Sequence, residues 1–306
     1  MIYTVTLNPA IDYVMTLPCF KEGTVNRSAN EEIFFGGKGI NVSVILNRLG
    51  VPSTALGFTA GFTGAAIEQG LSVEGISTDF VRLSAGNSRI NVKLNSVQET
   101  EINGQGPVIT EDDLRRLFQK LETLREGDVL ILAGSVPSTL PNDIYEQILS
   151  RLSDRGILFV VDAAGDLLTN VLKYRPFLIK PNHIELGEIF DTEITSFEQA
   201  AEYARELQMQ GAGNVLVSMG SQGAVLLDEN GAVTPMKAPK GTAVNTVGAG
   251  DSMLAGFVAG YLDGGDYSHA LSLATAAGAA TAFSKGLAEK ELIYRLLGEI
   301  TKNNIN

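Results

Sequence analysis

The chain has 306 residues, enough for one large α/β domain, and 44% of them are hydrophobic, so it can build a sizeable core. Its 35 acidic and 23 basic residues give a net charge of −12, which argues against binding to nucleic acid or to an anionic membrane surface. The single cysteine, Cys19, excludes an internal disulfide. A signal-like N-terminal segment and a membrane-length apolar run are both missing, and we expect a cytoplasmic protein.

The N-terminal third contains two kinds of strand. Apolar segments at 2–7 and 53–58 are typical of buried strands, and the segments 40–49 and 61–71 have helical patterns. The more polar segments 12–17, 31–35, 78–83 and 89–95 alternate, most clearly in 89–95. We expect them to form a small antiparallel sheet, built from about 12–35 and 78–104, that stands apart as a lid or a dimer surface.

The rest of the chain repeats short apolar strands between helices. Helices are predicted at 110–124, 142–155 and 196–210, the first with a capping box at Thr110 and Asp113, and strands at 128–133, 157–161, 177–179 and 214–217. A hairpin around Asn230 and Gly231 and three helical segments after residue 250 follow. This order predicts a single domain over 1–306, an α/β fold of three layers, α/β/α, with a mostly parallel central sheet.

One helix start stands out, at residues 245–252, with the sequence NTVGAGDS. Gly248, Ala249 and Gly250 leave the backbone N–H groups uncovered, and such groups at the positive end of a helix attract anions. Asp251 lies inside this region. Its carboxylate is either a helix cap or a base directed at a group that becomes negative.

Polar residues also follow five predicted strands of the main sheet, where ligands of parallel sheets bind. They are Asn8 and Asp12, Gly134 and Ser135, Asp162, Lys180 to Asn182, and Ser218 to Gly220. Loops are polar in any case, so each motif alone is weak, but their agreement across five strands indicates an active site.

Several common sites are not supported. The sequence has neither a P-loop nor a GxGxxG fingerprint after its first strand. The two histidines, His183 and His269, lie on separate predicted helices, far from the single cysteine, which argues against tetrahedral zinc. Asn182 and Glu185 share a helix face and could hold Mg²⁺ through water, or could simply cap the helix.

Glycines and basic residues indicate an anionic substrate. Residues 36–39, Gly-Gly-Lys-Gly, allow backbone amides to approach a ligand, and Lys38 can offset its charge. Arg27, Arg89 and Lys93 add positive charge from the expected lid, as a phosphate would require. For Lys93 a solvated strand face is the favoured interpretation.

Three motifs resemble one family. GGKGINV at 36–42 and NTVGAGDS at 245–252 are similar to the two signatures of the ribokinase-like (PfkB) sugar kinases, and NHIE at 182–185 matches their N-x-x-E motif. The order and spacing agree over nearly the whole chain. TLNPAID at 6–12 and TEINGQGP at 100–107 are similar to the hexose-phosphate branch of the family. Ser138 and Thr139 depart from its usual proline-rich continuation after residues 134–137.

The resemblance implies an ATP-dependent, Mg²⁺-requiring kinase in which Asp251 is the base and the amides of residues 248–251 form an anion hole. It places sugar hydroxyls on Asp12, Gly37, Asn41 and Asn103, and the existing sugar phosphate on Arg27, Lys38, Arg89 and Ser135. It places ATP beside Lys180, Asn182, Ser218, Gly220 and Gly223, and Mg²⁺ near Asn182 and Glu185.

The implied reaction is phosphorylation of fructose 1-phosphate to fructose 1,6-bisphosphate, by a homodimer that pairs through its β lid. Tagatose 6-phosphate and fructose 6-phosphate are alternative substrates. A catalytically inactive sugar-phosphate sensor is a further alternative, against which the intact Asp251 counts. A dehydrogenase is disfavoured by the missing dinucleotide fingerprint.

Overall fold

The computed structural model describes residues 1–304, and its centre is a ten-stranded sheet with the order β14-β13-β12-β11-β10-β9-β1-β4-β5, in which β6 pairs with β4. All pairs are parallel except the two that join β12, β13 and β14. The predicted mostly parallel central sheet is confirmed. The strands are β1 (Ile2–Thr6), β4 (Ser53–Ala60), β5 (Ser77–Thr78), β6 (Val81–Leu83), β9 (Val129–Ala133), β10 (Leu158–Asp162), β11 (Leu178–Ile179), β12 (Asn214–Ser218), β13 (Gly223–Leu227) and β14 (Val233–Lys237).

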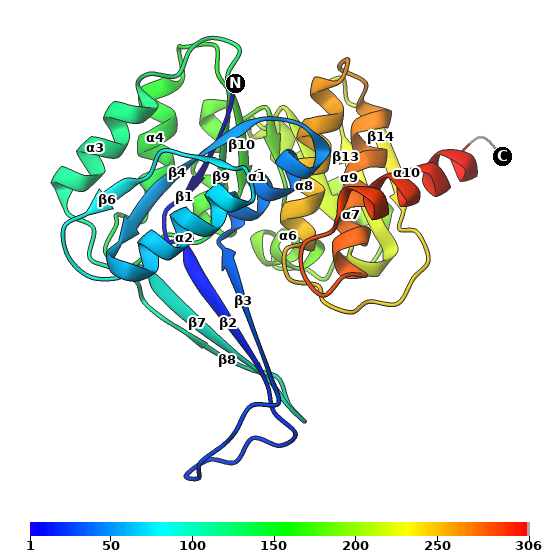
Figure 1. Cartoon of the computed structure of the whole chain (residues 1–306). Coiled ribbons are helices and arrows are strands. Elements are labelled where there is room, and N and C mark those ends of the chain that lie inside the picture. Colours follow the sequence, from blue (N-terminus) through cyan, green and yellow to red (C-terminus); the bar gives the residue numbers. More distant parts are fainter. Residues whose placement is uncertain (305–306) are drawn as a thin grey trace.

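Helices cover both faces of this sheet (Figure 1). One face carries α3 (Glu111–Leu121), α4 (Ile144–Leu152), the short α5 (Asp166–Thr169), α6 (His183–Ile189) and α7 (Phe197–Met209). The other carries α1 (Lys38–Leu49), α8 (Ala249–Leu262), α9 (Tyr267–Ala282) and α10 (Lys290–Asn304), with α2 (Gly61–Val73) packed beside α1. Within residues 1–304, no helix is long and apolar enough to cross a bilayer.

The central strands are apolar on both sides because both faces are covered. In β9, Leu130 and Leu132 join the core under α3, α4 and α7, whereas Val129 and Ile131 join the core under α1 and α8. The predicted capping box of α3 is present: Asp113 N–H donates to Thr110 Oγ1 over 3.2 Å, and Thr110 N–H donates to Asp113 Oδ2 over 3.1 Å.

A separate four-stranded sheet, which we call the lid, projects from the body (Figure 1). It consists of β2 (Ala10–Thr16), β3 (Asn30–Gly36), β7 (Arg89–Asn95) and β8 (Thr100–Asn103) in the order β3-β2-β7-β8. The outer pairs are antiparallel, as expected, but the central pair β2–β7 is parallel. Both central strands leave the body in the same direction, and each returns through a hairpin.

The expected extent of the lid needs one correction. Residues 78–83 were expected in the lid, but β5 and β6 pair with β4 at the edge of the main sheet. Val81 and Leu83 are buried while Arg82 between them is exposed, so the segment alternates because it lies on an edge strand with one covered face. The second half of the lid therefore begins at Arg89.

Candidate active site

The glycine-rich helix start forms the centre of the site. Gly248 precedes α8 in a left-handed conformation, with φ of 79°, and no side chain caps the helix. Asp251 lies in the first turn and is only 4% exposed. The N-cap position belongs to Gly248, so Asp251 does not act as the N-cap of α8.

Asp251 is held by a side chain from another helix. Asn41 Nδ2, in α1, donates a hydrogen bond of 2.7 Å to Asp251 Oδ2. Burial raises the pKa of Asp251 to about 6, and the negative charge of Asp162 adds to this effect, while Asn41 and two lysines oppose it. A carboxylate with such a pKa is a suitable proton acceptor near neutral pH.

Asp162 is the counter-ion of two lysines. It ends β10, is 1% exposed, and lies 3.2 Å from Lys38 Nζ through Oδ1 and 3.2 Å from Lys180 Nζ through Oδ2. Burial disfavours its charge, but the two ammonium groups outweigh burial and lower its pKa. Burial likewise opposes the charge of Lys38, yet the carboxylates of Asp162, Asp251 and Glu185 raise its pKa. The Asp162 carboxylate therefore pairs with both lysines and holds them at the site.

Lys180 adjoins the helix start directly. Its Nζ lies 3.2 Å from the position that a Cβ atom on Gly250 would take. An ammonium group and the N-terminus of α8 thus act on the same small volume, and together they form a binding region for an anion.

The glycine-rich start of α1 fits closely against β1. A Cβ atom on Gly39 would lie 2.7 Å from the carbonyl oxygen of Val5, so no larger residue fits there. The neighbouring Ile40 N–H donates to Thr6 Oγ1 over 2.9 Å. This close fit fixes the first turn of α1 and hence the positions of Lys38 and Asn41.

The inner face of the lid carries a second polar group. Asp12 Oδ1 accepts a hydrogen bond of 2.8 Å from Asn91 Nδ2, and Asp12 Oδ2 lies 3.8 Å from Lys93 Nζ. Lys93 Nζ also lies 3.6 Å from Glu101 Oε1, and only 13% of the Lys93 side chain is exposed. The prediction that Lys93 lies on a solvated strand face is therefore wrong. Arg89 Nε donates to the carbonyl oxygen of Asn8 over 3.1 Å at the base of the lid.

A cavity of about 1170 Å³ lies between the lid and the body. Asp12 and Lys93 line it from the lid, and Asn41 lines it from α1. Thr246 lines it from the loop before α8, and Leu287 from the loop after α9. Its lining extends from the lid to the loop before α8 and to Asn41, the hydrogen-bond partner of Asp251, as a site for a small polar substrate requires.

Residues 5–292 match the pfkB family of carbohydrate kinases. The chain belongs to this family. It is 47% identical to 1-phosphofructokinase of Bacillus subtilis (strain 168) over 98% of each chain, and 41% identical to D-tagatose-1-phosphate kinase of Bacillus licheniformis, also over 98% of each. Phosphofructokinase-2 from Escherichia coli, in complex with substrates and products, is 26% identical and has a TM-score of 0.92, covering 98% of this chain and 99% of its own.

The structure of this PfkB kinase brings several predicted site residues together. Lys38, Asn41, Lys180 and Asp251 form one connected cluster with Gly250, through the contacts described above. Asp12 joins it over Gly36: a Cβ atom on Gly36 would lie 3.3 Å from Asp12 Oδ2 and 3.7 Å from Asn41 Oδ1. The backbone of Gly37 turns beside Thr6, with φ of 124°.

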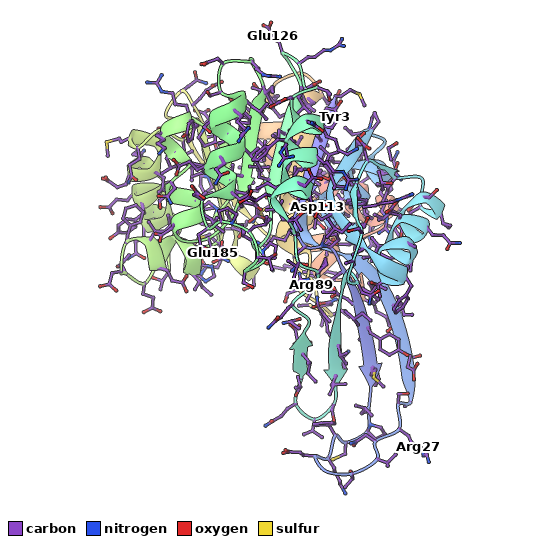
Figure 2. The ribbon with its side chains drawn as sticks, turned by 90° about the vertical axis from the view of Figure 1, so that its left-hand side faces the viewer. Tyr3, Arg27, Arg89, Asp113, Glu126 and Glu185 are labelled. Carbon is purple, nitrogen blue, oxygen red and sulfur yellow. The ribbon has the colours of Figure 1, made fainter. Side chains whose placement is uncertain are left out.

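Other predicted substrate residues lie farther out. Figure 2 shows Arg89 where the lid meets the body and Arg27 at the far tip of the lid, so Arg27 does not join the site of its own chain. The expectation that Arg27 lies beside the sugar phosphate of its own chain is therefore corrected. The paired strands β2 and β3 carry the loop that contains Arg27 away from the body. Asn103 and Ser135 are both exposed, Asn103 at the end of β8 and Ser135 after β9.

The residues expected beside ATP follow β11 and β12. Asn182 and Ser218 are joined by an isolated parallel bridge, and Gly220 is exposed, with φ of 58°. Gly223 is buried, and a Cβ atom there would lie 2.0 Å from the carbonyl oxygen of Met236. The pairing of β13 with β14 therefore requires a glycine at position 223, whether or not this residue contacts ATP.

Asn182 and Glu185 form the capping box of α6. Asn182 Oδ1 accepts from the N–H groups of Ile184 and Glu185, each over 2.8 Å, and Glu185 Oε2 accepts from Asn182 N–H over 2.8 Å. Asn182 and Glu185 therefore cap the helix, and the side-chain oxygen of Asn182 already accepts two backbone hydrogen bonds. Among residues 1–304, no group of three or more His, Cys, Asp or Glu side chains is arranged to hold a metal ion.

Two residues of the site were not assigned a role from the sequence. The sequence marks Asp162 only as a polar residue at a strand end, and Asn91 only as a polar member of an alternating strand. The partners of Asp162, Lys38 and Lys180, lie 124 and 18 residues away along the chain, so no local pattern indicates their contact. For Asn91 the available signal was the period-two alternation, which places it on the same face as Lys93.

Proposed function

We propose that this kinase transfers the terminal phosphoryl group of ATP to fructose 1-phosphate and produces fructose 1,6-bisphosphate and ADP. The observation that carries the proposal is the buried Asp251 in the uncapped first turn of α8, with Lys38 and Lys180 beside it. This arrangement offers a proton acceptor and a concentration of positive charge in one place, which is what phosphoryl transfer to a hydroxyl requires.

In the proposed reaction, Asp251 accepts the proton of the attacked sugar hydroxyl as its oxygen bonds to phosphorus. The bond between phosphorus and the ADP oxygen breaks, and ADP leaves with the electron pair. Asn41 keeps one oxygen of Asp251 fixed by its 2.7 Å hydrogen bond, so the other oxygen, Oδ1, is free to take the proton.

Charge on the transferred group is stabilised by fixed donors. Ala249 N–H donates to the carbonyl oxygen of Thr246 over 3.2 Å, so the donors proposed for the phosphoryl group are the N–H groups of Gly250 and Asp251 in the first turn of α8. Lys180 lies beside Gly250 and adds its positive charge. Lys38 and Arg89 face the phosphate already on the sugar. Since Asp162 holds both lysines before the substrates bind, little reorganisation is needed when the anions arrive.

We propose that Mg²⁺ accompanies ATP. Asn182 does not fit as a direct ligand, because its side-chain oxygen accepts two backbone N–H groups. Glu185 fits better, since only Oε2 of its carboxylate is bound, and it would hold the ion through water. When bound, Mg²⁺ would neutralise part of the charge on the ATP phosphates.

Tagatose 1-phosphate is the second candidate substrate, favoured by the 41% identity to D-tagatose-1-phosphate kinase of Bacillus licheniformis. It carries its phosphate on the same carbon as fructose 1-phosphate and differs in the configuration at carbon 4. The discrimination therefore depends on the residues that contact sugar hydroxyls, Asp12 above all, rather than on the residues that hold the phosphate.

We propose that the chain forms a homodimer through the lid. The outer face of the lid is apolar: Tyr13, Ile33, Val92 and Ile102 lie side by side in the register, and Ile33 and Ile102 are 55% and 59% exposed. A second lid would cover this face. In such a dimer Arg27, which is remote from its own site, would lie close to the partner and could contact the partner's substrate.

The test is an initial-rate assay of ADP release with ATP, Mg²⁺ and a panel of fructose 1-phosphate, tagatose 1-phosphate, tagatose 6-phosphate and fructose 6-phosphate. We expect the highest kcat/KM with fructose 1-phosphate. Binding of these sugars without turnover of any would instead support the sugar-phosphate sensor.

A further inference from the structure

The inner face of the lid presents a polar row that crosses three strands. Asp12 on β2 is the register partner of Asn91 on β7, and Asn91 is the register partner of Asn103 on β8. Register partners point to the same face of a sheet, so the three side chains lie in line. Asp12 lines the cavity between the lid and the body, and so does Lys93, which is two residues after Asn91 and on the same face.

Asn91 is the buried member of this row. The residue is 7% exposed, its Nδ2 donates to Asp12 Oδ1 over 2.8 Å, and its Oδ1 is buried without a hydrogen-bond partner among the described residues. The orientation of the amide is fixed by chemistry, because the atom that touches a carboxylate must be the donor. Asn91 thus binds Asp12 while its own carbonyl oxygen stays unpaired, which is unfavourable in a buried place.

The contact determines which oxygen of Asp12 is available. Oδ1 is occupied by Asn91, whereas Oδ2 lies over Gly36 beside Asn41, whose amide binds Asp251. Lys93 Nζ lies 3.8 Å from Oδ2 and forms an ion pair with the carboxylate, without a close hydrogen bond. One oxygen of Asp12 is therefore fixed in place by Asn91, and the other lies close to Gly36, as does Oδ1 of Asn41.

We propose that Asn91 is a positioning residue that sets sugar recognition: it fixes the Asp12 carboxylate so that one chosen oxygen meets a sugar hydroxyl, and thereby distinguishes ketohexose 1-phosphates that differ in hydroxyl configuration. This inference rests on the proposed function and extends it to a residue that does not itself touch the reacting atoms. A carboxylate fixed in this way accepts a hydroxyl in one direction, and an epimer that points its hydroxyl elsewhere leaves a buried acceptor unpaired.

The test compares three variants. Asn91→Leu has nearly the same size and removes the donor to Asp12, and Asn91→Thr suits a strand and keeps a hydroxyl that can donate to Asp12. Asn170→Leu is the matched control, because Asn170 is exposed at the end of α5 and does not line the cavity between the lid and the body. The measurements are KM for fructose 1-phosphate and for ATP, kcat, and the ratio of kcat/KM between fructose 1-phosphate and tagatose 1-phosphate.

For Asn91→Leu we expect KM for the sugar phosphate to rise about tenfold or more, with KM for ATP unchanged and the preference between the two epimers reduced. Asn91→Thr should recover most of this loss, and Asn170→Leu should behave as the wild type. A wild-type sugar KM in Asn91→Leu, equal losses in the Leu and Thr variants, or a parallel rise in KM for both substrates would overturn the inference.

Calorimetric titration with fructose 1-phosphate in the absence of nucleotide separates this inference from the proposed reaction. If the wild type turns over the sugar while Asn91→Leu binds it equally well, only the role of Asn91 is refuted. If the wild type turns over no member of the panel, the proposed function is refuted whatever the variants bind.

Discussion

Asn41 in α1 donates a 2.7 Å hydrogen bond to Asp251 in α8, across 210 residues of sequence. The two residues belong to the two signature segments of the family resemblance, 36–42 and 245–252, so the contact explains why both segments are needed in one site. Asn41 also lies near the lid, since its Oδ1 and the Oδ2 of Asp12 are both close to Gly36.

Replacing Asp251 by Asn removes the proton acceptor but keeps the shape of the side chain. We expect Asp251→Asn to lower kcat by about 10²- to 10⁴-fold while leaving the binding of fructose 1-phosphate intact. ADP release and calorimetry measure the two effects. Asp263→Asn is the matched control, because Asp263 lies at the other end of α8 and is exposed, and it should retain wild-type activity. Near wild-type turnover in Asp251→Asn would refute its role as the base.

The pH dependence of kcat/KM should report the ionisation of Asp251. Burial raises its pKa from the ordinary 3.8 to about 6, and only the ionised form accepts a proton, so the rate should fall as the pH drops through about 6. The pKa of Asp251 is higher in the folded protein than in the unfolded chain, so folding favours the protonated form of this residue. This residue's contribution to the free energy of unfolding therefore decreases as the pH rises from about 4 to about 6. A rate that stays constant down to pH 4.5 would contradict this assignment.

Asp162→Asn should move the acidic limb of the pH–rate profile to lower pH. The variant removes a negative charge that helps to raise the pKa of Asp251, and it frees Lys38 and Lys180 to stabilise the ionised base. It should also lower the melting temperature, because two partly or fully buried ammonium groups lose their counter-ion. Asp166→Asn, at an exposed position shortly after β10, is the control for both measurements. An unchanged limb in a folded Asp162→Asn enzyme would exclude the proposed influence on Asp251.

Ile33→Glu should weaken the proposed dimer. It places a charge on the apolar outer face of the lid, where a second lid would bury it without a partner. Light scattering coupled to size-exclusion chromatography should show a monomer at concentrations where the wild type is a dimer. Val73→Glu, an exposed position at the end of α2, should leave the mass unchanged.

The same interface can be tested through activity. If Arg27 contacts the partner's substrate, mixing Arg27→Ala with Asp251→Asn should restore activity, because a mixed dimer contains one complete site. No recovery after subunit exchange, in variants that do form mixed dimers, would show that Arg27 has no role across the interface.

Much of the fold was predictable because the signals were local. The apolar strand 128–133 and the capping box at Thr110 follow from neighbouring residues, and the structure contains both. At Asn182 the local sequence left capping and Mg²⁺ binding as alternatives, and the structure shows a capping box. The lid also followed from its period-two alternation. The parallel pairing of β2 with β7 did not, since alternation indicates a face and not a direction.

The rest of the site depends on contacts between distant segments. Residues 78–83 alternate like a lid strand, and only their pairing with β4 distinguishes them from one. Asp162 and Asn91 acquire their roles from Lys38, Lys180 and Asp12, which the fold brings to them from other strands and helices. Arg27 was placed by motif resemblance, which identifies a residue type but not the distance at which a hairpin holds it.

The most direct measurement is the identification of the product by phosphorus NMR after incubation of the wild-type chain with ATP, Mg²⁺ and fructose 1-phosphate. Our account predicts stoichiometric formation of ADP and of a sugar that carries phosphate on carbons 1 and 6. Unchanged fructose 1-phosphate, under conditions in which tagatose 6-phosphate is phosphorylated, would contradict it.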